Sequence, residues 1–286
     1  MSAPSSLTIS RLATRHLDEA RQLSLDAGWN QTRRDWERLL DLDPMGCIGG
    51  FLNGDLIGTV TLVSLGDRVG WIGMMLVSRS CRGNGYGRRL FQEVLREADK
   101  RSLQIVGLDA THLGLPLYQS EGFHAVTTLS RWSGSVQPET PSTPDLHSIE
   151  KEWTEPVVAL DHQFSGVDRR FLIRTLLNEA HTTGVVLVRD GRVRGFAMSR
   201  PGERFRHIGP VMADSPEQAS LLISELGRRH PDEPVLLDLP DRPDMDRHLL
   251  RLGLRPQRRL TRMTRPDPVS ILDSPKLPVI VSFEWG

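Results

Sequence analysis

At 286 residues the chain is long for one average domain and comfortable for two, and either half could bury a core without disulfides or metal ions. The apolar fraction of 38% and the charged fraction of 25% are ordinary for a globular protein, which excludes disordered and fibrous classes. The 36 basic and 36 acidic residues cancel, so no field of the whole molecule attracts nucleic acid or an anionic membrane.

The first half alternates predicted strands and helices. Apolar residues at helical spacing predict a helix over 16–27, which Gly28 ends, and Thr32 with Asp35 predicts the capping box of a second helix. Asn53-Gly54 can supply the positive φ angles of a tight hairpin turn within 47–63. The other expected elements are strands at 7–9, 69–77, 103–108 and 124–132, and helices at 90–98 and 116–121.

A segment rich in Pro, Ser and Thr, residues 134–147, predicts an interdomain linker, because prolines at this spacing suit neither a helix nor an inner strand. It divides the chain into parts 1–133 and 148–286. The second part repeats the order of the first, with a helix at 168–180, strands up to residue 212, a helix capped by Ser215, a strand at 234–239, a helix at 245–253 and a strand at 257–263. We therefore predict two similar α/β domains.

A glycine-rich turn, Arg82-Gly83-Asn84-Gly85-Tyr86-Gly87, lies between the predicted strand 69–77 and the helix that follows it. Backbone N–H groups at the start of a helix form an anion site, and glycines allow a bulky diphosphate to approach. The arginines gathered around the turn, including Arg79 and Arg88, can add charge-assisted hydrogen bonds. The turn therefore predicts a site for an anionic cofactor that carries a diphosphate.

The spacing of this turn argues against two common nucleotide-binding loops. A Walker loop needs Gly-Lys-Ser/Thr, and no lysine stands there. A dinucleotide fingerprint needs G-x-G-x-x-G and an acidic residue about 20 positions later. The glycines alone are equally compatible with a surface turn that binds nothing; the strand before, the amphipathic helix after and the arginines favour a ligand site.

The pattern R-x-x-G-x-G between a strand and a helix, followed by Leu117-Tyr118-Gln-Ser-Glu-Gly122-Phe123, resembles the GNAT N-acetyltransferase superfamily over residues 5–132. The second half resembles the degenerate GNAT-like domain of tandem members. The resemblance implies two GNAT-like domains, each with a central mixed sheet flanked by helices. It also implies acetyl-coenzyme A (acetyl-CoA) as the co-substrate and no metal.

The resemblance also implies roles for residues of the first half. The loop from Arg82 to Gly87, extended to Arg88, would hold the pyrophosphate of coenzyme A. Met75, Leu76 and Val77 would pair their backbone with the pantetheine arm, and the Leu76 N–H would stabilise the negative charge on the thioester oxygen. Tyr118 would protonate the departing thiolate.

Three of these assignments have alternatives. Tyr118 can also be a core tyrosine, but the catalytic role is favoured, because the chain has only two tyrosines, this one stands four residues before Gly122, and a phenol can donate a proton at neutral pH. Asp109 is the best-placed carboxylate for a base, but Asp after a strand more commonly caps a turn, and deprotonation through water needs no base. The junction of the first two helices contains Trp29, Asn30, Gln31 and Asp35. These side chains could bind a polar amine substrate, or they could equally form a hydrophobic staple and a helix cap.

The second half lacks the features that mark the first as a coenzyme A site. Met212-Ala213-Asp214-Ser215-Pro216-Glu217 replaces the glycine loop and would repel a pyrophosphate, and Leu249 stands where Tyr118 is expected. This half is expected to cover the acceptor side of the first or to form an oligomer interface, which leaves room for a homodimer. The function expected is acetyl-CoA-dependent N-acetylation of a small amine.

Two alternatives remain, an acyl-CoA sensor without turnover and a protein or peptide N-acetyltransferase. Cys47 and Cys81 form no disulfide framework, and with no signal peptide or membrane-spanning stretch a cytoplasmic protein without membrane or nucleic-acid partners is expected. The nine histidines have no ligand spacing, and Cys81 has no partner that marks it as a nucleophile.

Overall fold

The structure, a computed structural model, describes residues 6–138 and 143–286. The first half contains β1 (Thr8–Arg11), α1 (Leu17–Asp26), α2 (Arg33–Leu42), β2 (Cys47–Leu52), β3 (Asp55–Leu65), β4 (Val69–Val77), α3 (Tyr86–Lys100), β5 (Ile105–Ala110), α4 (Leu115–Ser120) and β6 (His124–Gly134). The second contains β7 (Leu146–Ser148), α5 (Lys151–Ser165), α6 (Arg170–Asn178), β8 (Thr183–Arg189), β9 (Arg192–Arg200), β10 (Arg206–Met212), α7 (Pro216–Arg229), β11 (Val235–Pro240), α8 (Pro243–Arg251) and β12 (Arg255–Arg265).

Local signals in the sequence account for several boundaries. The Thr32 hydroxyl accepts a hydrogen bond from Asp35 N at 3.3 Å and the Asp35 carboxylate accepts one from Thr32 N at 2.8 Å, which confirms the predicted capping box of α2. Asn53 and Gly54 have φ of 54° and 97° in the β2–β3 turn. Ser215 caps α7 as predicted, because its side chain accepts from Gln218 N.

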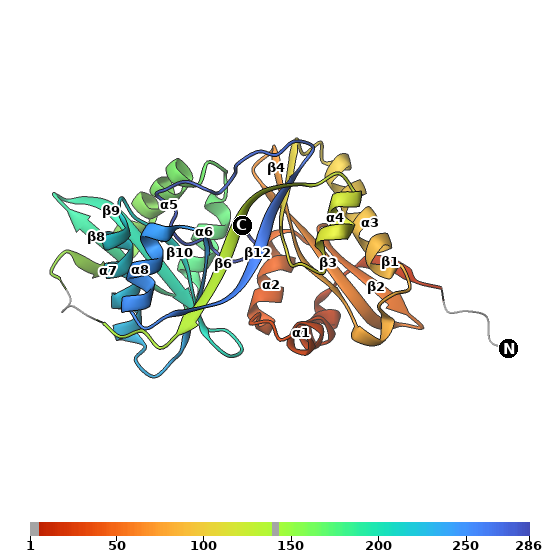
Figure 1. Cartoon of the computed structure of the whole chain (residues 1–286), viewed down its shortest axis with the longest axis horizontal. Coiled ribbons are helices and arrows are strands. Elements are labelled where there is room, and N and C mark those ends of the chain that lie inside the picture. Colours follow the sequence, from red (N-terminus) through yellow and green to blue (C-terminus); the bar gives the residue numbers. More distant parts are fainter. Residues whose placement is uncertain (1–5, 139–142) are drawn as a thin grey trace.

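The mixed α/β class is confirmed, but the two expected sheets are one. All twelve strands form a continuous sheet in the order β1-β2-β3-β4-β5-β12-β6-β11-β10-β9-β8-β7. Figure 1 shows β6 and β12 side by side in the middle of an elongated molecule, with one lobe on either side of them.

The two central strands exchange places between the halves. β12, expected to complete the second half, is antiparallel to β5 of the first half, and β6 of the first half is antiparallel to β11 of the second. The predicted segment 134–147 therefore follows a strand that both lobes share. Local periodicity predicts strands but not their neighbours, because pairing is decided by side chains far apart in sequence.

One buried ion pair joins each exchanged strand to its new neighbour. Asp109 on β5 faces Arg262 on β12, and the guanidinium donates from Nε and Nη2 to the two carboxylate oxygens at 2.9 Å each. Asp238 on β11 faces Arg131 on β6 in the same way, at 2.6 and 2.7 Å. Two bonds in a parallel fork select one register, so these pairs specify where β12 and β6 lie.

β4 and β5 pair in parallel only as far as Ile72 and Leu108, and past that point β4 has no strand on this side. A bulge accompanies the separation, because the register with β3 shifts by one residue near Met74, whose φ is 48°. The Thr59 hydroxyl donates to the Met74 carbonyl at 2.7 Å and supports the bulge. The separation opens the sheet between β4 and β5.

The hydrophobic core crosses the border between the halves. α3 buries Leu90, Phe91 and Val94 in a cluster of the first half, and α7 and α8 cover a cluster of the second. A third cluster contains residues from α1, α2, α5, α6 and the segment after β12, including Trp36 and Trp285. No helix in the described part of the chain has both the length and the apolar character needed to cross a membrane.

The segment between the halves contains more structure than a linker was expected to have. Residues 139–142 lie outside the described residues; before them Gln137 N donates to Leu252 O at 2.9 Å, and after them β7 pairs with β8. The residue pattern over 151–165 did not predict α5. Its Pro156 lies inside the helix, where proline normally argues against helical structure.

Candidate active site

Residues 82–87 form the turn between β4 and α3, where the sequence predicts an anion site. Gly83 and Gly85 have φ of +81° and +76°, and Gly85 immediately precedes α3. A Cβ at either position would meet nothing within 4 Å, so backbone conformation, not crowding in the free protein, favours glycine. The first bond into the helix joins Arg89 N to Gly85 O at 3.2 Å, and the N–H groups before it are available to an anion.

The arginines around this turn differ in their partners. Arg82 donates from Nε to Val77 O at 3.0 Å, and Arg79 donates to a backbone carbonyl of α1 at 3.3 Å. Neither has a carboxylate partner within the described residues. Arg88, also predicted to bind the cofactor, pairs instead with Glu121 at 2.7 Å. The charges of Arg79 and Arg82 therefore remain for a ligand, whereas that of Arg88 is already paired.

A groove of about 690 Å³ runs from this turn along the open edge of β4, and a volume of this size suits a cofactor. It lies between β4 and the segment from β5 to α4, and β12 contributes to one wall. Its lining includes the predicted residues Trp29, Met75, Leu76, Val77, Arg82 and Tyr118, together with Arg79, Thr111, His112, Leu113, Leu117, Arg258 and Arg259.

Tyr118 lies on α4 at the inner side of the groove. Its ring packs against Phe91 and Phe123 at centroid distances of 4.8 and 6.4 Å, and the residue is 8% exposed. Burial raises the pKa of the Tyr118 phenol well above its ordinary value, so the hydroxyl keeps its proton at neutral pH. A close glycine, Gly114, leaves room for the ring, since a Cβ there would lie 3.1 Å from the phenol oxygen.

A smaller pocket of about 70 Å³ adjoins the groove where β4 and β5 separate. The two share Trp29, Met75, Thr111, Tyr118 and Arg258. The pocket adds Gln31 from the loop between α1 and α2, together with residues of the opened sheet and of the segment that follows β12, namely Ile72, Gly73, Met74, Leu108, Asp109, Leu260, Phe283 and Glu284. The arrangement can place a small second reactant against the inner end of a molecule bound in the groove.

Two of the predicted substrate residues are used in contacts between the lobes. The Asn30 side chain donates to Phe205 O at 2.9 Å and accepts from two backbone N–H groups of the β9–β10 loop. Asp35 pairs with Arg38 at 2.7 Å and with Arg200 at 3.4 Å. Burial raises the pKa of Asp35, but these two guanidinium groups hold it below its ordinary value. Neither side chain lines the pocket.

Asp109 lines the small pocket but is held by Arg262. Both carboxylate oxygens accept from the guanidinium, and neither side chain is exposed to solvent. Burial raises the pKa of Asp109, and Arg262 opposes the rise. This geometry favours a role in strand pairing over the role of base that the sequence suggested, because a base needs a lone pair directed at its proton donor.

Several pocket residues were not singled out from the sequence. Glu284 and Phe283 come from the segment after β12, and Arg258 comes from β12 itself. Nothing in the spacing of these residues links them to the glycine turn, because the exchange of strands brings them there. Within residues 6–138 and 143–286, His, Cys, Asp and Glu side chains form no group of three that could hold a metal ion.

Comparisons with known proteins agree with this architecture. Residues 13–123 match the model of the acetyltransferase (GNAT) family, and residues 157–273 match that of an acetyltransferase (GNAT) domain. "Uncharacterized N-acetyltransferase YitH" of Bacillus subtilis (strain 168) is 27% identical over 234 residues, which cover 80% of this chain and 81% of the relative. "Holothin acyltransferase" of Pseudoalteromonas sp. (strain SANK 73390) is 27% identical over 188 residues, 65% of this chain and 63% of the relative.

Solved structures show the same fold over the whole length. A putative acetyltransferase from Pyrococcus horikoshii superposes with a TM-score of 0.80 at 17% identity, over 99% of this chain and 97% of that one. A tandem GNAT protein from the clavulanic acid biosynthesis pathway superposes with a TM-score of 0.66 at 16% identity, over 93% of this chain and 100% of that one. The two halves thus share a fold with tandem proteins.

Proposed function

This chain belongs to the GNAT acetyltransferases as a tandem member and is an acyltransferase, and we propose that its first half transfers an acetyl group from acetyl-CoA to a small primary amine. The observation that carries the proposal is the junction at Tyr118. There a groove of about 690 Å³, which begins at the glycine turn, meets a pocket of about 70 Å³. One reactant can enter from each side.

The groove has the chemistry that coenzyme A requires. Residues 82–87 present backbone N–H groups at the start of α3, and Arg79 and Arg82 add positive charge without a carboxylate partner among the described residues. The open edge of β4 at Met75, Leu76 and Val77 leaves backbone groups for the amide groups of pantetheine. These residues would hold the cofactor, which supplies the acetyl group as a thioester.

The transfer needs a neutral amine, a stabilised carbonyl oxygen and a proton for the leaving sulfur. We assign the proton donor to Tyr118, which burial keeps protonated and which borders both cavities. A backbone N–H of the open strand, in our proposal that of Leu76, stabilises the negative charge on the oxygen. The C–N bond forms as the C–S bond breaks, so the amine attacks directly and no residue of the protein is acetylated.

The second half is proposed not to bind a second cofactor. Its counterpart of the glycine turn is closed by protein contacts: Ser215 caps α7, and the Asp214 carboxylate pairs with Lys276 at 3.0 Å. A phosphate that approached this loop would therefore meet a carboxylate, and the Ser215 side chain would already be bonded to an N–H group at the start of the helix. Leu249, at the position that corresponds to Tyr118, is fully buried and has no proton to donate.

The test is a panel of primary amines incubated with acetyl-CoA, read as release of free thiol and by mass of the product. We expect acetylation of one or more small amines and, by calorimetry, one equivalent of coenzyme A per chain. Binding without transfer across the panel would favour an acyl-CoA sensor, and transfer to peptides alone would favour a protein acetyltransferase. Two equivalents of coenzyme A would contradict the proposal for the second half.

A further inference from the structure

The segment after β12, residues 266–286, returns to the middle of the molecule and packs directly against the open part of β4. The indole N–H of Trp71 donates to Phe283 O at 2.9 Å. A Cβ on Gly73 would lie 2.9 Å from the Cα atom of Glu284, so only a glycine allows this approach. The backbone at Glu284 is therefore held against the wall of the small pocket.

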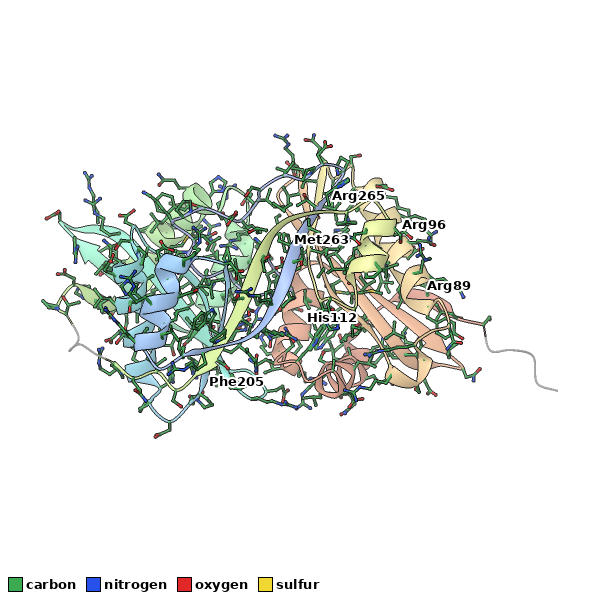
Figure 2. The ribbon with its side chains drawn as sticks, viewed as in Figure 1. Arg89, Arg96, His112, Phe205, Met263 and Arg265 are labelled. Atoms are coloured by element: carbon green, nitrogen blue, oxygen red, sulfur yellow. The ribbon has the colours of Figure 1, made fainter. Side chains whose placement is uncertain are left out.

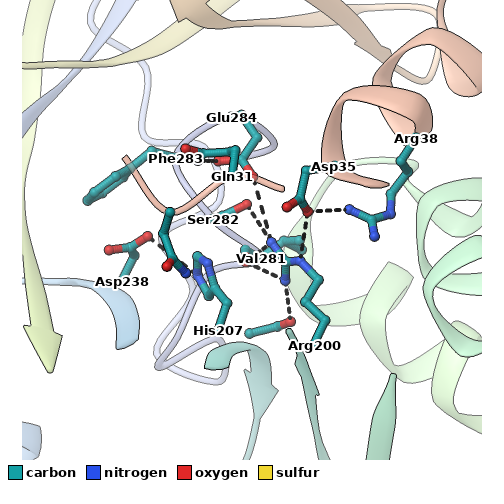
Figure 3. Close-up of polar contacts among 12 residues, drawn as sticks. Gln31, Asp35, Arg38, Arg200, His207, Asp238, Val281, Ser282, Phe283 and Glu284 are labelled. Carbon is teal, nitrogen blue, oxygen red and sulfur yellow. Dashed lines mark hydrogen bonds and ion pairs between the residues drawn. The ribbon is translucent and has the colours of Figure 1, made fainter. Parts of the chain in front are cut away.

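The Glu284 side chain is buried, with 2% of the residue exposed, and one of its oxygens is not satisfied. Oε2 accepts from Gln31 Nε2 at 2.8 Å, whereas Oε1 receives no hydrogen bond of ordinary geometry from the described residues, although the Ser282 hydroxyl lies close enough to lower the pKa of the carboxyl. The nearest cation, Arg200, lies 3.7 Å from Oε1 and donates instead to Ser282 Oγ at 3.0 Å and to the carbonyl of Val281. Figure 3 shows Glu284 and Gln31 together beside Arg200.

A second unsatisfied acceptor lies beside the first. Gln31 Oε1 is also buried without a hydrogen-bond partner, and both residues line the small pocket. The orientation of the Gln31 amide follows from its bond to Glu284, because a carboxylate cannot donate. Unpaired buried acceptors are rare and costly, so two together indicate a donor that arrives with the substrate. An ammonium group has three N–H donors and a positive charge.

The other carboxylates nearby cannot take this role. Asp109 lines the same pocket, but Arg262 occupies both of its oxygens. Asp35 is paired with Arg38 and does not line the pocket. Among the described residues, Glu284 is thus the pocket carboxylate with an oxygen free to accept.

We propose that Glu284, together with Gln31, receives the ammonium group of the acceptor and that Glu284 accepts its proton. The inference rests on the function proposed above and names its base. One proton moves from the ammonium nitrogen to Glu284 Oε1, which leaves a neutral amine whose lone pair attacks the acetyl carbon and a neutral carboxyl group. That proton then passes to water. After the attack the nitrogen loses a second proton, which replaces the proton that Tyr118 gives to the leaving sulfur. The second half of the chain thus supplies an essential group to the site of the first.

The buried surroundings of Glu284 make its carboxylate a stronger proton acceptor than an exposed glutamate. Burial raises the pKa of the Glu284 carboxyl and the nearby Asp35 raises it further, whereas Arg200 and the Ser282 hydroxyl lower it, with a net rise. The groups that line the same pocket from the other elements are the cationic Arg258 on β12, the paired Asp109 on β5 and the neutral phenol of Tyr118 on α4. His207 on β10 lines a neighbouring cavity that also reaches Glu284, and burial lowers the pKa of His207 well below its ordinary value.

The experiment compares Glu284→Gln and Glu284→Asp with the wild type, and uses Glu233→Gln as the matched control. Glu233 pairs with Arg206 outside the pocket. With the best amine of the panel, we expect Glu284→Gln to lower kcat/KM about 100-fold or more at neutral pH, and Glu284→Asp to retain part of the activity. Coenzyme A affinity and Tm should stay close to those of the control.

The pH profile separates a base from a structural residue. The wild-type rate should rise as Glu284 loses its proton and then level off, whereas the rate of Glu284→Gln should keep rising at alkaline pH, where the free amine forms in solution. A Glu284→Gln enzyme with unchanged kcat/KM and an unchanged profile would overturn the assignment while leaving the proposed function intact.

A second readout does not depend on turnover. In protein labelled with ¹³C-carboxyl glutamate, the signal lost in Glu284→Gln identifies Glu284, and we expect it to titrate above the ordinary value of 4.5 and to shift when ethylamine is added to the coenzyme A complex. A Glu284 signal whose chemical shift does not change when ethylamine is added would overturn the inference. Failure to bind coenzyme A at all would instead contradict the proposed function.

Discussion

Tyr118 and Asp109 are both candidate catalytic residues in the sequence, but the contacts around the two buried side chains differ. Both are close to fully buried and both line the small pocket. The Tyr118 phenol has a pKa that is raised by burial alone, and it borders the cofactor groove as well. Asp109 has Arg262 across both oxygens, so its charge is used to pair strands. The pairing of Asp109 with Arg262 therefore distinguishes it from Tyr118, for which we propose a role in proton transfer.

Removing the Tyr118 hydroxyl should therefore affect chemistry and not binding. Tyr118→Phe keeps the ring that packs on Phe91 and removes only the proton donor, so we expect kcat to fall about 100-fold with little change in coenzyme A affinity or Tm. Steady-state kinetics, calorimetry and thermal unfolding measure the three quantities. A variant that turns over at the wild-type rate would remove Tyr118 from the mechanism.

At the scale of elements, the glycine turn combines two requirements that a single residue type meets. Gly85 has a positive φ immediately before α3, and the open space beside it is what the anion site that we propose would need. The turn of the β2–β3 hairpin has only the first of these requirements, the positive φ. Gly54 there also has a positive φ, and a Cβ added to it would meet nothing within 4 Å, but the element that follows it is the strand β3 and not a helix.

These two glycines form a matched pair for an experiment. Gly85→Ala and Gly54→Ala should each lower the free energy of unfolding by about 1 kcal/mol, because alanine is strained at positive φ. Only Gly85→Ala should also raise the Kd of coenzyme A, by about tenfold or roughly 1.4 kcal/mol, since a strained turn would no longer direct its N–H groups at the proposed phosphate. Urea unfolding and calorimetry give both values. Equal Kd values for the two variants would contradict a pyrophosphate site at this turn.

At the scale of the molecule, the exchange of β6 and β12 makes the two lobes depend on each other. The sheet is continuous through twelve strands, and the largest core cluster contains side chains from both halves. Figure 2 shows side chains filling the region between the lobes around the two central strands, with Met263 labelled on β12. Neither lobe can lose its borrowed strand without exposing an unpaired sheet edge.

We therefore expect the chain to unfold in a single transition, with equal calorimetric and van't Hoff enthalpies. Arg262→Met leaves Asp109 buried without its cation and should lower stability by about 3–5 kcal/mol. Scanning calorimetry should show the whole transition moving to lower temperature. Two separate transitions, of which Arg262→Met shifts only one, would mean that the lobes unfold independently.

Short-range patterns in the sequence were enough for most helices and strands, for the caps of α2 and α7 and for the glycine turn. These features depend on residues a few positions apart, whose preferences act before any tertiary contact forms. The prediction failed at α5, where Pro156 lies within a helix that packs against α6 and β9, and at the short strand β7. Tertiary packing there outweighs the local preference.

The family was thus accessible from residues 69–123 alone, and so was the cofactor site that we propose, whereas the acceptor side was not. Gln31, Asp109 and Glu284 are separated by long stretches of chain and meet only because β12 crosses into the first half and the segment after it follows. Which carboxylate has a free oxygen depends on which arginine reaches it, Arg262 for Asp109 and none at hydrogen-bond distance for Glu284 Oε1. Such contacts arise from folding of the whole chain, so no local spacing encodes them.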